Sequence, residues 1–158
     1  MAHGQERANW RTAPFNQWAF HHVRELLPTS DIVYFGDIAH APYGSKSQDV
    51  LSRYTAESLA LLKERGAERI ISACNSVSAS LALSLFDAFN LEPGDIIEMV
   101  GPTVSYFKYS EARIALCATP ATIKAGIYQN AFRMLGKEVG AVAVPDLAGA
   151  IEDYTAAI

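Results

Sequence analysis

The sequence has no long apolar run, no block of basic residues and only two cysteines among its 158 residues. A membrane-spanning helix requires about 20 consecutive apolar residues, and no stretch approaches that length, so we expect no membrane partner. The net charge of −4, without a basic cluster, also argues against nucleic acid as a partner. The first residues lack the basic and apolar segments of a secretory signal, which predicts a cytoplasmic protein.

The two cysteines, Cys74 and Cys117, have neither the spacing of a metal-ligand pair nor that of a disulfide framework. Reduced thiols fit the cytoplasm. We therefore expect no bound metal and no disulfide.

Half of the residues are apolar and 19% are charged, which is the balance of a globular protein with a sizeable core. Apolar periodicity predicts alternating strands and helices. Strands are predicted over 31–35, 96–100, 113–117 and 138–144 and directly before Cys74. Helices are predicted over 15–27, from Ser47 to Gly66, from the Cys74 corner through Phe89, over 101–109, from Thr119 to Gly136, and over 145–158.

This order predicts an α/β fold with right-handed parallel crossovers. The elements come around twice, once from Asp31 and once from Ile96, so we expect a parallel sheet flanked by helices in two similar three-layer lobes, the second incomplete. The expected divisions are a loose tail over 1–14, a first lobe over 15–92 and a partial second lobe over 93–158.

The stretch from Arg69 to Phe89 passes from an apolar strand through a Cys74-Asn75-Ser76 corner into a helical pattern. Such a corner lies at the carboxyl end of a parallel strand, where α/β folds bind ligands. The positive end of the helix would favour the thiolate of Cys74 as a base or nucleophile. The alternative is a small buried hydrophobe without chemistry.

Two further segments are candidates for the same edge. The loop after the first strand carries Pro42, Tyr43 and Gly44, which can present backbone N–H groups and a phenol there, or can form an ordinary turn with the tyrosine packed inward. Thr119 and Thr122 begin a helix with Pro120 at its first position; this start can bind a carboxylate or can only cap the helix.

The motifs that carry this pattern resemble those of bacterial glutamate racemase, in the aspartate/glutamate racemase superfamily. Four segments match in order and spacing, and together they are specific: Tyr34–Asp37, Ala41–Ser47, Ala73–Ser76 and Ala118–Gln129. The resemblance covers roughly residues 26–144.

The resemblance implies an isomerase that interconverts L- and D-glutamate without a cofactor and supplies D-glutamate for peptidoglycan. By similarity, Cys74 is one of two cysteine bases. Substrate-holding positions would be Pro42, Tyr43, Gly44, Asn75, Ser76, Thr119 and Thr122, with serine at 76 where the family usually has threonine.

The family's Asp-Ser-Gly motif does not occur near residues 11–13, and its second catalytic cysteine would fall beyond Ile158. We therefore expect a truncated racemase that is impaired on its own, with exposed strand edges that favour a homo-oligomer. Three alternatives stay open: an aspartate racemase, an inert scaffold or binding module, and a thiol-dependent acyl-transfer enzyme with His40 as the base.

Overall fold

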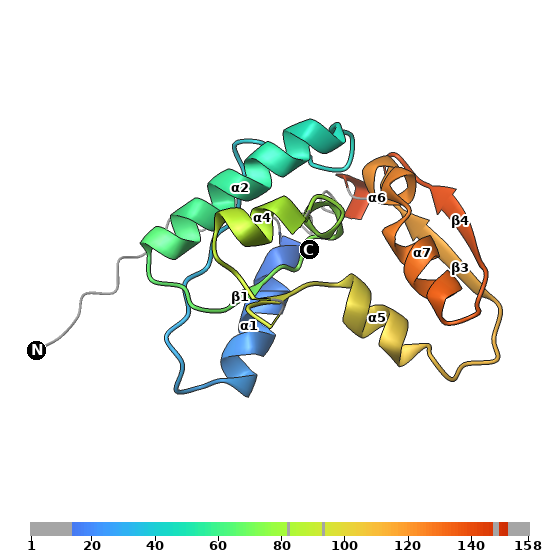
Figure 1. Ribbon diagram of the computed structural model, residues 1–158, viewed down its shortest axis with the longest axis horizontal. Helices are drawn as coiled ribbons and strands as arrows, with labels where there is room; N and C mark the ends of the chain where they lie inside the picture. The colour runs from blue at the N-terminus through green and yellow to red at the C-terminus, as the bar shows by residue number, and fades with distance from the viewer. Residues whose placement is uncertain (1–13, 82, 93, 147–148, 152–158) are drawn as a thin grey trace, which may run out of the picture.

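A computed structural model describes residues 14–81, 83–92, 94–146 and 149–151. In this part of the chain, helices alternate with short parallel strands, which confirms the predicted α/β class (Figure 1). The helices are α1 (Pro14–Leu26), α2 (Gln48–Glu64), α3 (Asn75–Ser78), α4 (Leu83–Ala88), α5 (Val100–Tyr106), α6 (Pro120–Ala125) and α7 (Ile127–Met134). The strands are β1 (Ile70–Ile71), β2 (Ile96–Ile97), β3 (Ile114–Ala118) and β4 (Val139–Ala143).

The first sheet pairs β1 with β2 in parallel, with Ile70 opposite Ile96. These two isoleucines are buried and pack with Leu59 of α2 and with Leu91. Helix α2 reaches this core because Leu51, Thr55 and Leu59 repeat every four residues and all three are buried.

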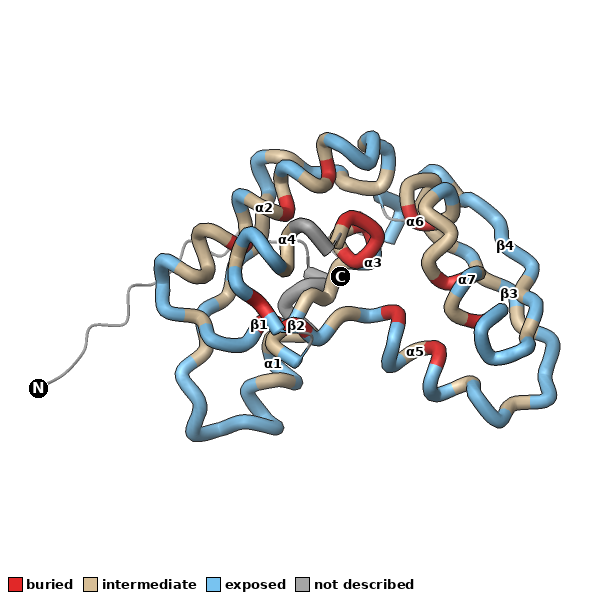
Figure 2. Tube along the Cα trace, viewed as in Figure 1, coloured by how far each residue is buried: buried red, intermediate tan, exposed pale blue. Residues whose placement is uncertain are grey.

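The second sheet pairs β3 with β4 in parallel over five residue pairs, from Ile114–Val139 to Ala118–Ala143. Its core is formed by Val100 and Val104 of α5 with Tyr128 and Phe132 of α7. Figure 2 shows the buried residues of α5 and α7 apart from those of α2 and β1. Each sheet thus has its own apolar core.

The opposite face of each sheet is open. In the first sheet, Ile71 and Ile97 lie side by side and are 49% and 53% exposed. In the second, Cys117 and Val142 are paired neighbours and both are exposed. Parallel sheets are normally covered on both faces, so these surfaces are unusual; the expected homo-oligomer stays a prediction.

Three predicted elements differ from the structure. The extended residues 31–35 pair with no strand in the described segments, so the predicted strand there is wrong. The helix expected after Cys74 is two helices, because α3 ends at Ser78. The helix expected from Thr119 to Gly136 is also two, because Gly126 adopts a left-handed conformation with φ 68° between α6 and α7.

The tail over 1–14 falls almost wholly outside the described residues, as does much of the helix expected over 145–158. The domain boundaries stay a prediction. Across the described segments, none of the helices has both the length and the apolar character needed to span a bilayer.

We predict that Phe132→Ala lowers the free energy of unfolding by about 3–5 kcal/mol, because truncating a buried aromatic side chain removes contacts and leaves a cavity. Phe132 is only 2% exposed in the second core. Urea unfolding followed by circular dichroism measures the change.

Met134→Ala is the matched control in the same helix, because Met134 is 87% exposed; its effect should stay within about 0.5 kcal/mol. Equal effects of the two substitutions would contradict the core described here.

Candidate active site

Three chain segments meet between the two sheets: the loop over 36–47, the start of α3 and the start of α6. The N–H of Ala121 donates a hydrogen bond to the carbonyl oxygen of Gly44 at 3.0 Å. The hydroxyls of Ser76 and Thr119 lie 3.5 Å apart. The structure therefore joins the first-sheet motifs to a second-sheet motif at one place.

Gly44 permits the closest of these approaches. A Cβ atom at this position would lie 2.6 Å from Cγ2 and 2.7 Å from Cβ of Thr119. Contacts that short require a shift of the loop or of the helix start. Glycine is needed here for close packing, because it alone leaves room for Thr119.

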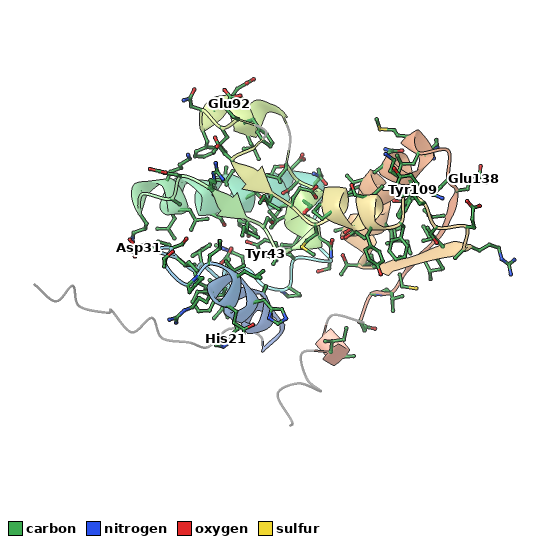
Figure 3. All side chains as sticks on the ribbon, turned by 90° about the horizontal axis from the view of Figure 1, so that it is seen from below. His21, Asp31, Tyr43, Glu92, Tyr109 and Glu138 are labelled. Atoms are coloured by element: carbon green, nitrogen blue, oxygen red, sulfur yellow. The ribbon has the colours of Figure 1, made fainter. Side chains whose placement is uncertain are left out.

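The loop is held in shape by Asp37. Its carboxylate accepts a hydrogen bond from the Tyr43 hydroxyl at 2.5 Å and lies 2.7 Å from Nδ1 of His40. The His40 ring in turn stacks on Tyr54 of α2, with ring centroids 4.0 Å apart. Figure 3 labels Tyr43 near the middle of the view.

These contacts act on two pKa values. Burial raises the pKa of Asp37, but the hydrogen bonds from Tyr43 and His40 outweigh it and hold the pKa below its ordinary value of 3.8. Burial raises the pKa of Tyr43 well above 10.0, and the hydrogen bond and charge of Asp37 act in the same direction. The Tyr43 phenol therefore stays protonated and directed at Asp37.

Cys74 lies directly before α3 and is half-buried, so it is not sealed in a core. Its charged form is close enough to Tyr43 to contribute to the raised pKa of that phenol.

Helix α2 holds the segment that follows α3 through two contacts. The hydroxyls of Thr55 and Ser80 lie 2.6 Å apart, and the Gln48 amide donates to the carbonyl of Ala79 at 2.6 Å.

Hydrogen-bond donors lie on the two helix starts that meet beside the Cys74 segment of the chain. The first turn of α3 leaves backbone N–H groups without intrahelical partners. Thr119 occupies the N-cap position of α6, but in the described structure its hydroxyl does not cap the helix and instead lies 3.2 Å from that of Thr122. Thr122 and Ser76 are both buried. These neutral donors can bind a carboxylate, and the deprotonated sulfur of Cys74 can accept a proton from a carbon held near it.

A hollow of about 210 Å³ adjoins the loop and α6 and is lined by Lys46, Ser47, Gln48, Ala121, Lys124 and Ala125. Its lining does not include Cys74. We base the candidate site on Cys74 and the donors, because the reactive group lies there.

Other candidates fall outside the site or carry no ligand geometry. Cys117 is exposed on the open face of β3, away from Cys74. No group of three or more potential metal ligands occurs among the residues that the structure describes.

Sequence reasoning quoted Asp37 and Tyr128 within motifs but assigned neither a role. Asp37 could have been found as a carboxylate just beyond an apolar run, at the edge where the site was expected. Tyr128 gave a weaker signal, because its hydroxyl hydrogen bond to Asn75 at 2.6 Å joins residues 53 positions apart.

Known proteins similar to this chain are amino-acid racemases. Glutamate racemase of Aquifex aeolicus is 36% identical over 131 residues, which are 83% of this chain and 51% of that protein. Glutamate racemase of Desulforudis audaxviator is 38% identical over 132 residues, 82% of this chain and 48% of that protein. No family model matches the sequence.

Solved structures agree. Glutamate racemase from Aquifex pyrophilus superimposes with a TM-score of 0.75 at 33% identity, covering 82% of this chain and 51% of the other. Glutamate racemase from Francisella tularensis, in complex with D-glutamate, gives a TM-score of 0.79 at 27% identity over 87% and 52%.

The α/β fold and these similarities place the chain among amino-acid racemases. More narrowly, the proteins and structures that it resembles are glutamate racemases, as its motifs predicted. The chain spans about half the length of the relatives it matches.

We predict that Gly44→Ala weakens the contact between the loop and α6, because the added methyl group would meet Thr119. The expected loss of stability is about 1–3 kcal/mol, the usual cost of overpacking. Thermal and urea unfolding measure it.

Gly94→Ala serves as the control, because a Cβ there meets nothing within 4 Å. A Gly44→Ala protein as stable as the Gly94→Ala protein would show that the close approach has no energetic weight.

We predict that Asp37 stabilises the protein in a pH-dependent way. Its folded pKa lies below the ordinary 3.8, so its contribution is fully present above that value and is lost as pH falls through the folded pKa. Asp37→Asn should therefore lower the unfolding free energy by about 1–2 kcal/mol near pH 6 and by much less near pH 2.5.

Asp87→Asn, at an exposed aspartate of α4, controls for the change in net charge. The assignment fails if the Asp37→Asn deficit is the same at both pH values.

Proposed function

We propose that this chain binds glutamate between its two sheets and that Cys74 removes the α-proton of the amino acid. The observation that carries the proposal is the half-buried Cys74 thiol beside the Tyr43 loop and the donor groups of α3 and α6. Similarity to glutamate racemases supports glutamate as the substrate.

The chemistry explains why these groups belong together. The Cα–H bond breaks, the proton passes to the thiolate sulfur, and the electron pair moves into the substrate carboxylate. The resulting species carries more negative charge than glutamate, so donors already aimed at the carboxylate stabilise it. We assign this role to backbone N–H groups of Gly44 and α3, to the Asn75 amide and to the hydroxyls of Ser76 and Thr119.

The outer parts of the segment act indirectly. Pro42 and Tyr43 shape the loop, with the Tyr43 hydroxyl held by Asp37. Thr122 supports Thr119 by hydroxyl contact. The reaction needs no cofactor in this scheme, because the thiolate accepts the proton itself.

Inversion also needs an acid on the opposite face of the substrate. Cys117 is exposed on the second sheet, and no contact among the described residues links it to Cys74. We propose that the 158-residue chain exchanges the α-proton but racemises poorly, and that the complete activity supplies D-glutamate for peptidoglycan in the cytoplasm.

The acyl-transfer alternative finds less support. It requires His40 as the base for Cys74. The Asp37 contact at Nδ1 would leave Nε2 available for that role, but among the described residues no hydrogen bond joins His40 to Cys74. An aspartate racemase and an inert binding module remain the competing proposals that the experiment must separate.

The test is proton exchange in D₂O. The chain is incubated with L-glutamate or D-glutamate, and loss of the α-proton signal is followed by ¹H NMR. We expect slow exchange with the wild-type chain and loss of exchange by at least about 100-fold in Cys74→Ala, because general-base catalysis contributes on that scale.

Cys117→Ala is the matched control and should exchange at the wild-type rate. Aspartate in place of glutamate tests the substrate: faster exchange with aspartate would favour the aspartate racemase. Binding of glutamate without exchange would leave only the binding module. If the chain showed neither binding nor exchange, the proposed function would be refuted for this chain.

A further inference from the structure

One hydrogen bond outside the proposed reaction centre ties a substrate-facing side chain to the second sheet. The hydroxyl of Tyr128, on α7, donates to Oδ1 of Asn75, at the start of α3, at 2.6 Å. We propose that Tyr128 is a positioning residue, which fixes the Asn75 amide so that its N–H₂ group, and not its oxygen, faces the substrate carboxylate.

An asparagine amide has two ends of similar shape and opposite hydrogen-bonding character. Asn75 is exposed, so packing does not select between the two orientations. Once Oδ1 accepts the tyrosine proton, the amide plane directs Nδ2 away from Tyr128. Among the described residues, Nδ2 of Asn75 donates no hydrogen bond, so both of its protons are available to a ligand.

The environment of Tyr128 keeps it a donor. The residue is 5% exposed and belongs to the second core, next to Phe132. Burial raises the pKa of Tyr128 above 10.0. A hydrogen bond with Thr103 opposes this effect without cancelling it, and the negative charge of Glu98 adds a smaller upward effect. The phenol therefore retains its proton at any ordinary pH.

Glu98 is itself held in place. Its two carboxylate oxygens accept hydrogen bonds from the N–H groups of Val100 and Gly101 at the start of α5. The Tyr128 phenol is thus influenced by the charge of the Glu98 carboxylate and donates its hydrogen bond to the amide oxygen of Asn75. Because the core residues of α7 fix the ring, the direction in which the hydroxyl points is a property of the fold.

This role rests on the proposed function, because it assigns Asn75 to the substrate carboxylate. Without the Tyr128 hydroxyl, the amide rotates freely and for part of the time presents its oxygen to the carboxylate. Two acceptors then face each other, which weakens binding of the amino acid and of the more anionic species that follows proton removal.

The test is a double-mutant cycle on glutamate binding, measured by calorimetry with the 158-residue chain. Tyr128→Phe keeps the ring and removes the hydroxyl; we expect it to weaken binding about 5- to 20-fold, the range for loss of one oriented hydrogen bond. In the Asn75→Ala background, the same substitution should change the affinity less than about 2-fold, because Tyr128 acts through Asn75.

Equal losses in both backgrounds would overturn the proposal, since Tyr128 would then act by holding the fold together. Tyr109→Phe is the matched control: Tyr109 is 84% exposed and is labelled well apart from Tyr43 in Figure 3, so binding should not change.

A second measurement does not require glutamate. The side-chain amide signals of Asn75 are identified in a ¹H–¹⁵N spectrum as the pair missing from Asn75→Ala. In Tyr128→Phe we expect the chemical shifts of these two amide signals to change and the Asn75 amide group to rotate faster. Unchanged signals would overturn the proposal. A wild-type chain that binds no glutamate would refute the proposed function, and the amide signals alone would then decide whether Tyr128 orients Asn75.

Discussion

The structure depends on the close approach of Gly44 to the start of α6. Each sheet has its own core, so burial of apolar surface does not by itself bring the two sheets together. The contact between them is polar and local: a carbonyl accepting from Ala121, the hydroxyls of Ser76 and Thr119, and the phenol of Tyr128 on Asn75. The first two of these contacts lie in the candidate site and the third holds Asn75, one of its side chains, so the geometry of the site depends on how the two sheets are arranged.

The polar side chains at the helix starts are explained by these contacts between the sheets. Thr119 has the sequence position of a cap, and a threonine there would ordinarily satisfy a backbone N–H of its own helix. In the described structure its hydroxyl meets Ser76 and Thr122 instead. The free backbone donors and the hydroxyls then face the same region as Cys74, where an anionic amino acid would need them. Local helix stability is given up in favour of a set of donors.

Much of the fold follows from short-range pattern. The helical spacing of Leu51, Tyr54, Leu61 and Leu62 predicts α2, and short apolar runs predict the regions of β1 to β4. The predicted strand at 31–35 failed because a strand exists only with a partner, and pairing is a long-range property that apolar character does not encode. Cys74 could be predicted as a candidate because it follows β1. Tyr43 was predicted from its loop motif, although the strand expected before that loop does not form. Tyr128 was not, because its role depends on a contact across 53 residues, and the open faces at Ile71 and Val142 likewise depend on what lies opposite them.

The left-handed turn at Gly126 has a consequence for how the site is aimed. If one continuous helix ran from Pro120, residue 128 would lie on the axis of α6. The direction of its side chain would then depend on how the start of that helix is placed. The reversal at φ 68° gives α7 an axis of its own, which the second core can fix independently of α6. One residue without a side chain therefore uncouples two tasks: α6 contributes hydroxyls, while α7 aims a phenol, and each can vary in evolution without misdirecting the other.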